Sequence, residues 1–164
     1  MNKFFLFIIT LIIASPSTTK KASFVYDTAI EIGVTDMDCN DLLNPSNPAS
    51  FKKEEIKFFY LNQGVIEEVY NEMRDAKRNF LMYKNDNKSW RNRLPNSEYL
   101  MRLFPNLSSL EKLPVTYIQW NTEDTDTIQC EYDRSEGFVA CSKVWLNGEL
   151  VWNGSEPRHI DIVK

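Results

Sequence analysis

Residues that build the commonest catalytic and metal sites are scarce in this sequence. Its 164 residues include one histidine, three cysteines and five glycines. No glycine-rich phosphate loop, His-Glu-x-x-His zinc motif or Gly-x-Ser-x-Gly nucleophile motif occurs. A catalytic triad or a zinc site with several histidines would have to rely on His159 alone, so neither is expected. We therefore expect no metal and no cofactor, and favour a protein that is not an enzyme.

An excess of positive charge is also lacking. Lysine and arginine total 19 against 23 acidic residues, which gives a formal net charge of −4. Proteins that bind nucleic acid usually show a basic excess, so a nucleic-acid partner is not expected. The hydrophobic share of 43% and charged share of 26% are ordinary for a globular chain. They predict one compact domain with a real core.

Long apolar runs are absent except for one near the N-terminus. A run of eleven residues from Phe4 to Ala14, apolar except for Thr10, follows Lys3 and precedes Ser15-Pro16-Ser17. As a helix this run would span about 16 Å, roughly half of the hydrocarbon core of a membrane. The pattern is typical of a secretory signal peptide. We expect a signal peptide over residues 1–17, a single domain over 18–164, a secreted or periplasmic location, and no stable membrane anchor after cleavage.

Cysteine is rare, but its spacing suggests a pair. If residues 134–137 form the loop of a hairpin, position 133 faces 138 and Cys130 faces Cys141. Opposed residues on antiparallel strands lie close to disulfide geometry, and an exported protein meets oxidising conditions. The sequence therefore predicts a Cys130–Cys141 disulfide. Cys39 would stay free or link to a second chain as a dimer.

The first half of the chain has helical spacing. After Ser50, apolar residues recur every three or four positions, which predicts a long helix: they are Ile56, Phe59, Tyr60, Ile66, Val69, Tyr70, Met73, Ala76, Phe80 and Tyr83. Shorter helices are expected over residues 97–104 and 108–113, each followed by proline. Residues 23–34 alternate with period two, which favours a strand, with a helix from Asp27 as the alternative.

From Val115 onward the pattern changes to strands. They are expected over residues 115–120, 127–132, 138–146, 149–152 and 159–163, with Asn147-Gly148 as a tight hairpin turn. The whole order predicts an α+β fold, in which the long helix and the short helices pack on one face of a C-terminal antiparallel β-meander. This order of elements is similar to that of cone-shaped, nuclear-transport-factor-like α+β folds. That resemblance implies a curved sheet around a pocket.

A polar segment supplies the candidate partner-binding residues. Lys88, Arg91 and Arg93 surround Trp90 in the one region with a local basic excess. The segment from Asp36 to Asn40 begins like a calcium loop, but the template needs glycine and glutamate where Asp41 and Asn47 stand. A metal site is therefore not expected there.

Two functions from different classes remain. The first is an exported, non-enzymatic protein that binds a protein partner, such as an enzyme to be inhibited or a surface assembly. The alternative is a domain that binds or processes a small ligand in a pocket between helices and sheet. Large aromatic residues on the expected sheet face are the candidates to line it: Trp120, Tyr132, Trp145 and Trp152. A structural subunit tethered through Cys39 is a third interpretation.

Overall fold

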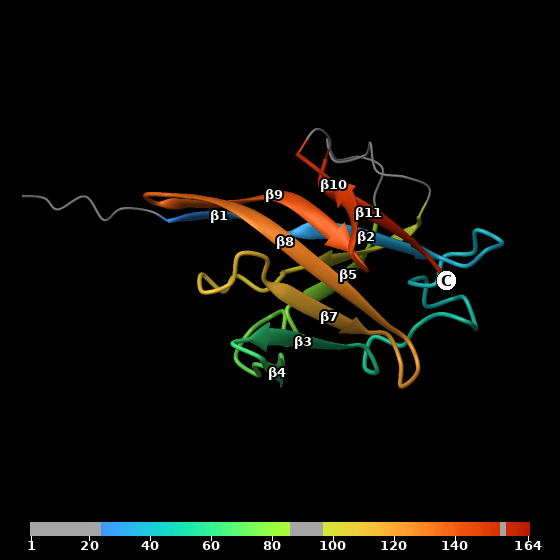
Figure 1. Ribbon diagram of the computed structural model, residues 1–164. Coiled ribbons are helices and arrows are strands. Elements are labelled where there is room, and N and C mark those ends of the chain that lie inside the picture. The colour runs from blue at the N-terminus through green and yellow to red at the C-terminus, as the bar shows by residue number, and fades with distance from the viewer. Residues whose placement is uncertain (1–23, 86–96, 155–156) are drawn as a thin grey trace, which may run out of the picture.

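The computed structural model describes residues 24–85, 97–154 and 157–164. Over these residues the chain folds into two β-sheets that pack face to face (Figure 1). No helix occurs in the described part of the chain, so the expected α+β fold is wrong. In the same residues no helix is long and apolar enough to cross a membrane.

The large sheet contains seven strands. Its order is β1 (Val25–Asp27), β9 (Phe138–Leu146), β8 (Thr125–Ser135), β7 (Val115–Gln119), β3 (Lys57–Asn62) and β4 (Val65–Glu68). The seventh strand, β10 (Glu149–Trp152), pairs with the other end of β9. All pairings are antiparallel except that of β1 with β9, which is parallel.

The small sheet contains four strands in the order β11 (His159–Val163), β2 (Ile30–Thr35), β6 (Tyr99–Leu103) and β5 (Phe80–Lys84). Strand β2 is central, parallel to β11 and antiparallel to β6. Strands β1 and β2 follow each other in the chain but belong to different sheets. The chain therefore crosses from one layer to the other at Thr28 and Ala29.

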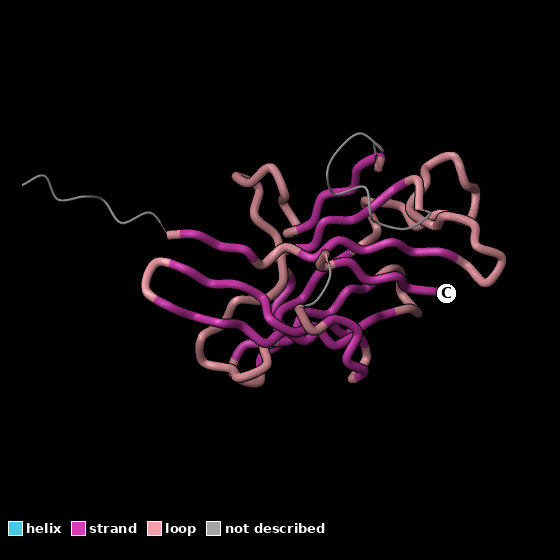
Figure 2. The backbone as a smooth tube through the Cα atoms, turned by 90° about the horizontal axis from the view of Figure 1, so that it is seen from above, coloured by secondary structure: helices cyan, strands magenta, loops and turns pink. Residues whose placement is uncertain are grey.

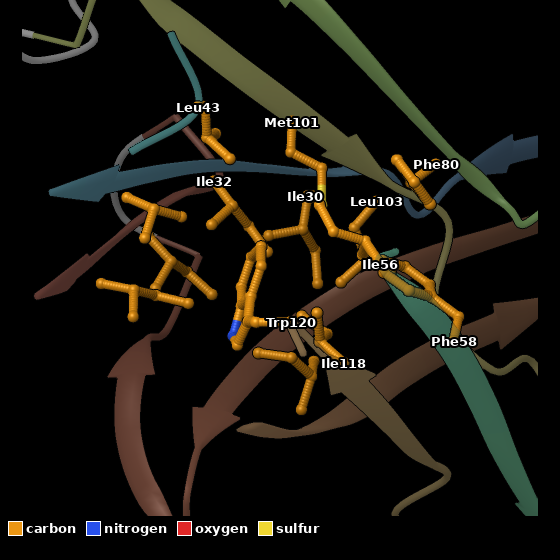
Figure 3. Close-up of a cluster of buried hydrophobic side chains, with 14 of the residues drawn as sticks. Ile30, Ile32, Leu43, Ile56, Phe58, Phe80, Met101, Leu103, Ile118 and Trp120 are labelled. Atoms are coloured by element: carbon orange, nitrogen blue, oxygen red, sulfur yellow. The ribbon is translucent and has the colours of Figure 1, made fainter. Parts of the chain in front are cut away.

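The core lies between the two sheets. Apolar side chains at alternate positions of the central strands of each sheet point inward, as expected where only one face of a sheet is covered. Figure 3 shows side chains of β2, β6 and β5 facing those of β3 and β7, with the Trp120 ring among them. The fully buried members include Ile30, Ile32, Ile56, Phe58, Met101, Leu103, Ile118, Trp120, Ile128 and Val144.

The expected long helix over residues 50–83 is instead two strands, a loop and the start of a third strand. Strands β3 and β4 form a hairpin in which Asn62 pairs with Val65. Gln63 and Gly64 between them have φ values of 50° and 82°, the left-handed conformation that tight hairpin turns require. The apolar spacing arose because two strands and a loop happened to place apolar residues three or four apart. The aromatic run Phe58-Phe59-Tyr60 has the stronger β preference.

The expected short helices are also wrong. Residues 99–103 form β6, and the side chains of Leu100, Met101 and Leu103 are fully buried. Residues 108–113 are not helical. A strand buried on both faces is a nearly continuous apolar run, which periodicity alone does not separate from a buried helix. With no helices to cover a sheet, the expected cone-like pocket between helices and sheet is absent from the described residues.

The C-terminal strands agree with expectation. The bounds of β9, β10 and β11 match the expected ones, and Asn147 and Gly148 have the positive φ values of a tight turn. Leu146 lies opposite Glu149, and Trp145 lies opposite Leu150, as the hairpin signal predicts. The local turn chemistry therefore fixed this register.

The register of the β8–β9 hairpin differs from expectation. Its turn is Glu136-Gly137 and not a four-residue loop, so Ser135 lies opposite Phe138 and Asp133 opposite Ala140. An irregularity between Glu131 and Tyr132 shifts the pairing again. As a result, Val144 faces the core, whereas Trp145, which was expected on the core face of the sheet, does not.

The predicted Cys130–Cys141 disulfide is wrong for the same reason. Cys130 lies opposite Val144, and Cys141 lies opposite Tyr132, so the two cysteines are not a cross-strand pair. Both are buried free thiols. Their hydrogen bond, together with burial, raises the pKa of Cys130 well above its usual value. The same bond lowers the pKa of Cys141.

Candidate functional site

The sequence-predicted partner-binding residues Lys88, Trp90, Arg91 and Arg93 lie outside the described residues. Exposed Cys39 lies in a turn and has a φ of 63°. Its link to a second chain stays a prediction.

The four aromatic residues expected to line a pocket are placed in different surroundings. Trp120 is fully buried in the core, where its Nε1 donates a hydrogen bond of 2.6 Å to Asp126. The Tyr132 hydroxyl donates to the carbonyl oxygen of Asn106 at 2.8 Å. Trp145 is half-buried on β9. Only Trp152, at the end of β10, lines the largest of the cavities described below.

One part of the large sheet projects beyond the small sheet. It comprises β1 with Phe24 and the tip of the β8–β9 hairpin, residues 133–140, and is called the arm below. Figures 1 and 2 show it from two directions as an extension with β1 alongside β9. Four large apolar side chains are exposed on it: Phe24 at 52%, Val25 at 50%, Tyr26 at 61% and Phe138 at 39%.

The backbone of β1 is available along one side. Val25 donates its amide hydrogen to the carbonyl oxygen of Gly137 at 2.8 Å, so its polar groups point toward β9. Successive residues of a strand point their amides in opposite directions, so the N–H and C=O of Tyr26 point away from β9. Among residues 24–85, 97–154 and 157–164, no strand pairs with that side of β1.

The two faces of the arm carry different chemistry. On the inner face, which continues the core side of the sheet, the Phe24 and Tyr26 rings lie with centroids 4.8 Å apart. On the outer face, Asp27 and Asp133 flank Ala140 in one row across three strands. The inner face is therefore aromatic, whereas the outer face carries two carboxylates beside the exposed side chains of Val25 and Phe138.

A groove lies beneath the inner face of the arm, with a volume of about 460 Å³. Phe104, Pro105 and Leu107 form its apolar part, and Arg74 brings a positive charge. This arm groove has a hydrogen-bonded wall: Arg74 donates to Asn79, which donates to the Tyr60 hydroxyl, which donates to the carbonyl oxygen of Phe104. Burial raises the pKa of Tyr60, so its hydroxyl remains a donor at neutral pH.

A second and larger hollow lies where the two sheets meet at the β1–β2 crossing. This junction cavity has a volume of about 790 Å³, and its lining includes Asp27, Glu31, Arg102, Trp152 and Arg158. The Arg158 guanidinium donates to Asp27 at 3.2 Å and to the carbonyl oxygens of Ala29 and Cys141 at 2.9 and 3.1 Å. It also lies 4.9 Å from the centroid of the Trp152 ring. Arg158 therefore joins both sheets at the crossing.

A second ion pair, between Arg102 and Glu31, also lines the junction cavity. Arg102 donates twice to one carboxylate oxygen of Glu31, at 2.8 and 2.5 Å. The Tyr83 hydroxyl donates to the other oxygen of Glu31 at 2.5 Å. Burial and the adjacent Glu31 raise the pKa of Tyr83 to about 12, so it stays protonated. The positive charge of Arg102 and the negative charge of Glu31 thus neutralise each other.

The remaining sequence candidates show no catalytic arrangement. His159 Nε2 lies 2.8 Å from Asp161, and its Nδ1 has no hydrogen-bond partner among the described residues. In the turn that begins at Asp36, Oδ1 of Asp36 accepts backbone hydrogen bonds from Asp38 and Asn40, and Oδ2 accepts one from the Asn40 side chain. In the described part of the chain, no three His, Cys, Asp or Glu side chains are grouped to hold a metal.

Sequence reasoning missed the arm. Residues 24–27 have the alternation of a strand, and Glu136-Gly137 has the glycine of a tight turn. Neither pattern shows that the small sheet ends before the arm. The end of the small sheet is set by the lengths of its own strands, which are distant from the arm in sequence. No family model, curated protein or solved structure is significantly similar to this chain, so its geometry must carry the functional argument.

Proposed function

We propose that this protein acts without catalysis, by binding another polypeptide through the arm. The observation that carries the proposal is the set of exposed apolar side chains on the arm, with Phe24 and Tyr26 on its inner face and Val25 and Phe138 on its outer face. Exposed apolar surface that gathers in one region of a soluble protein commonly marks an interaction site. If the leader is removed as the sequence predicts, the partner is outside the cytoplasm, for example an enzyme to be inhibited or a surface assembly.

The opposite edge of the same sheet offers a matched control. On β4, Val65 and Ile66 are each 58% exposed, which is comparable to the arm residues. A variant with Val65→Ser and Ile66→Ser therefore removes a similar kind of surface far along the sheet from β1.

The test compares three tagged proteins recovered from the exported fraction of the host after mild cross-linking. They are the natural protein, the β4 variant, and an arm variant with Phe24→Ser, Tyr26→Ser and Phe138→Ser. We expect the natural protein and the β4 variant to retain the same partner and the arm variant to lose it, with equal melting temperatures. Equal recovery by the folded arm variant would contradict the proposal.

A second candidate function is binding of a small ligand in the junction cavity. Its volume of about 790 Å³ supports this alternative, since it falls in the range of small-molecule sites. Trp152 in its lining provides the readout. A ligand should change tryptophan fluorescence saturably in the natural protein and much less in a Trp152→Phe variant. No saturable change across a broad metabolite set would count against this function.

A further inference from the structure

The arm has a strand edge, an aromatic inner face and an outer face with two carboxylates in one place. Resting on the proposed function, we infer that the arm binds an extended segment of its partner as an added β-strand alongside β1, and that this segment alternates apolar with basic side chains. Strand addition is a common mode of peptide recognition, in which main-chain hydrogen bonds give affinity and alternate side chains give specificity.

The backbone of β1 supplies the first element. Because Val25 bonds to Gly137 of β9, the amide and carbonyl of Tyr26 point to the opposite side. Tyr26 is also the most exposed of the four apolar arm residues. An extended chain can therefore pair with Tyr26 without displacing a strand that the structure describes.

The inner face selects apolar side chains. In an added strand, every second side chain lies on the same face as the Phe24 and Tyr26 rings, since side chains alternate between faces. The arm groove begins at Tyr26 and continues to Phe104 and Pro105. An apolar side chain of the added strand would cover these rings and enter the groove.

The outer face selects basic side chains. The alternate side chains of an added strand lie beside Asp27, whose side chain is 65% exposed although its carboxylate also contacts Arg158. Asp133 lies two strands away in the same row, and no cation pairs with it among the described residues. Opposite charges on neighbouring strands stabilise pairing, so lysine or arginine fits this face.

A second copy of this chain is the competing occupant. Its net charge of −4 and its own Asp27 would bring like charges together at the arm, which opposes pairing of two β1 strands. We therefore commit to a basic and apolar segment of a different polypeptide.

The experiment measures the binding of two labelled peptides with blocked ends by fluorescence anisotropy. One is Lys-Val-Lys-Phe-Lys-Val-Lys, and the other replaces every lysine by glutamate. We expect the lysine peptide to bind about tenfold more tightly. Neutralising the row with Asp27→Asn and Asp133→Asn should weaken the lysine peptide about fivefold. A control variant with Glu54→Gln and Glu55→Gln, on a distant loop, should leave it unchanged.

Two substitutions at one position isolate the backbone contribution. Tyr26→Ala removes the ring but keeps the amide hydrogen, whereas Tyr26→Pro removes both. Proline is compatible with an edge strand whose N–H faces away from the sheet, so the pairing of β1 with β9 should persist in both. We expect Tyr26→Pro to bind the lysine peptide about fivefold more weakly than Tyr26→Ala.

The outcomes separate this inference from the proposed function. If the two peptides bind equally, if neither binds, or if Tyr26→Pro binds as well as Tyr26→Ala, strand addition is overturned. Partner recovery by the arm would still stand on its own test. If native mass spectrometry shows the natural protein dimerising and Tyr26→Pro monomeric, the second copy is the occupant and the inference is also overturned.

Discussion

Large apolar residues are buried in the core between the two sheets but exposed on the arm. The inner face of the large sheet passes through both: Val144 is fully buried between the sheets, whereas Tyr26 in the arm is 61% exposed. The large sheet continues into the arm, but the small sheet that covers it ends. Burial between the sheets contributes about 1.5–3 kcal/mol for each large apolar side chain, and the arm residues gain only part of this. The apolar side chains of the arm therefore contribute little to the stability of the fold, and stability does not account for their presence on the surface.

The largest contrast should appear in amide hydrogen exchange. The Glu31 amide in β2 donates to the carbonyl oxygen of Arg158 at 3.0 Å and is buried, whereas the Tyr26 amide faces away from β9. We expect Glu31 to exchange more slowly than Tyr26 by about a thousandfold or more, because the first needs extensive unfolding and the second does not. Similar rates, measured by NMR, would mean that the arm is covered in solution.

The next largest effect is expected from Trp120→Ala. This ring is fully buried and stacks at 5.1 Å on Phe51. Its loss should lower the free energy of unfolding by about 3–5 kcal/mol, measured by urea denaturation. If the variant does not fold, Ile118→Val tests the same interior with an expected loss of about 0.5–1.5 kcal/mol. A negligible loss for the milder variant would show that the sheets are not tightly packed there.

A smaller effect is expected from Asp126→Asn. Burial alone would raise the pKa of Asp126, but hydrogen bonds from Asn147, Lys164 and Trp120 outweigh it and lower the pKa below 3.8. The substitution should cost about 1–3 kcal/mol at neutral pH.

The pH dependence follows from the direction of this shift. A carboxyl group with a lowered pKa stabilises the folded state above its unfolded-state value and loses that contribution as pH falls through the folded-state value. The stability difference between the natural protein and Asp126→Asn should therefore be constant above about pH 5 and shrink below pH 3.8. A difference that did not change with pH would mean that the Asp126 charge is not what stabilises the fold.

The smallest effect on stability is expected from the arm variant with serine at Phe24, Tyr26 and Phe138. Exposed substitutions usually change stability by less than about 0.5 kcal/mol each. Thermal unfolding should therefore resemble that of the natural protein. A loss as large as that of Trp120→Ala would make the arm part of the core and remove the main argument for binding.

The fold was predictable from sequence where turn chemistry was local. Asn147-Gly148 fixed the β9–β10 hairpin, and the bounds of three C-terminal strands followed. The N-terminal half was predicted wrongly, because its apolar spacing fits a helix and the one local hairpin signal, Gly64 with a φ of 82°, was given less weight. Parallel pairing of β2 with β11 could not be read from either strand alone.

The candidate site was less predictable than the fold. A one-residue irregularity beside Glu131 decides which side chains of β9 face the core, and it is not visible in the sequence. Exposure of Tyr26 on the inner face likewise depends on the extent of the opposite sheet. The sequence does contain the alternation of β1, but only the three-dimensional arrangement shows that one side of it is open.

The position of β2 has a consequence for how the chain acquires its structure. Its partner β11 lies more than a hundred residues later, with Glu31 opposite His159, and pairs of this separation slow folding because a large loop must be closed first. In the small sheet β2 lies between β11 and β6, so this layer is incomplete until the late strand arrives. A ribosome-bound chain that stops before β11 should therefore remain sensitive to protease, and native protection should appear only after synthesis has passed Val163.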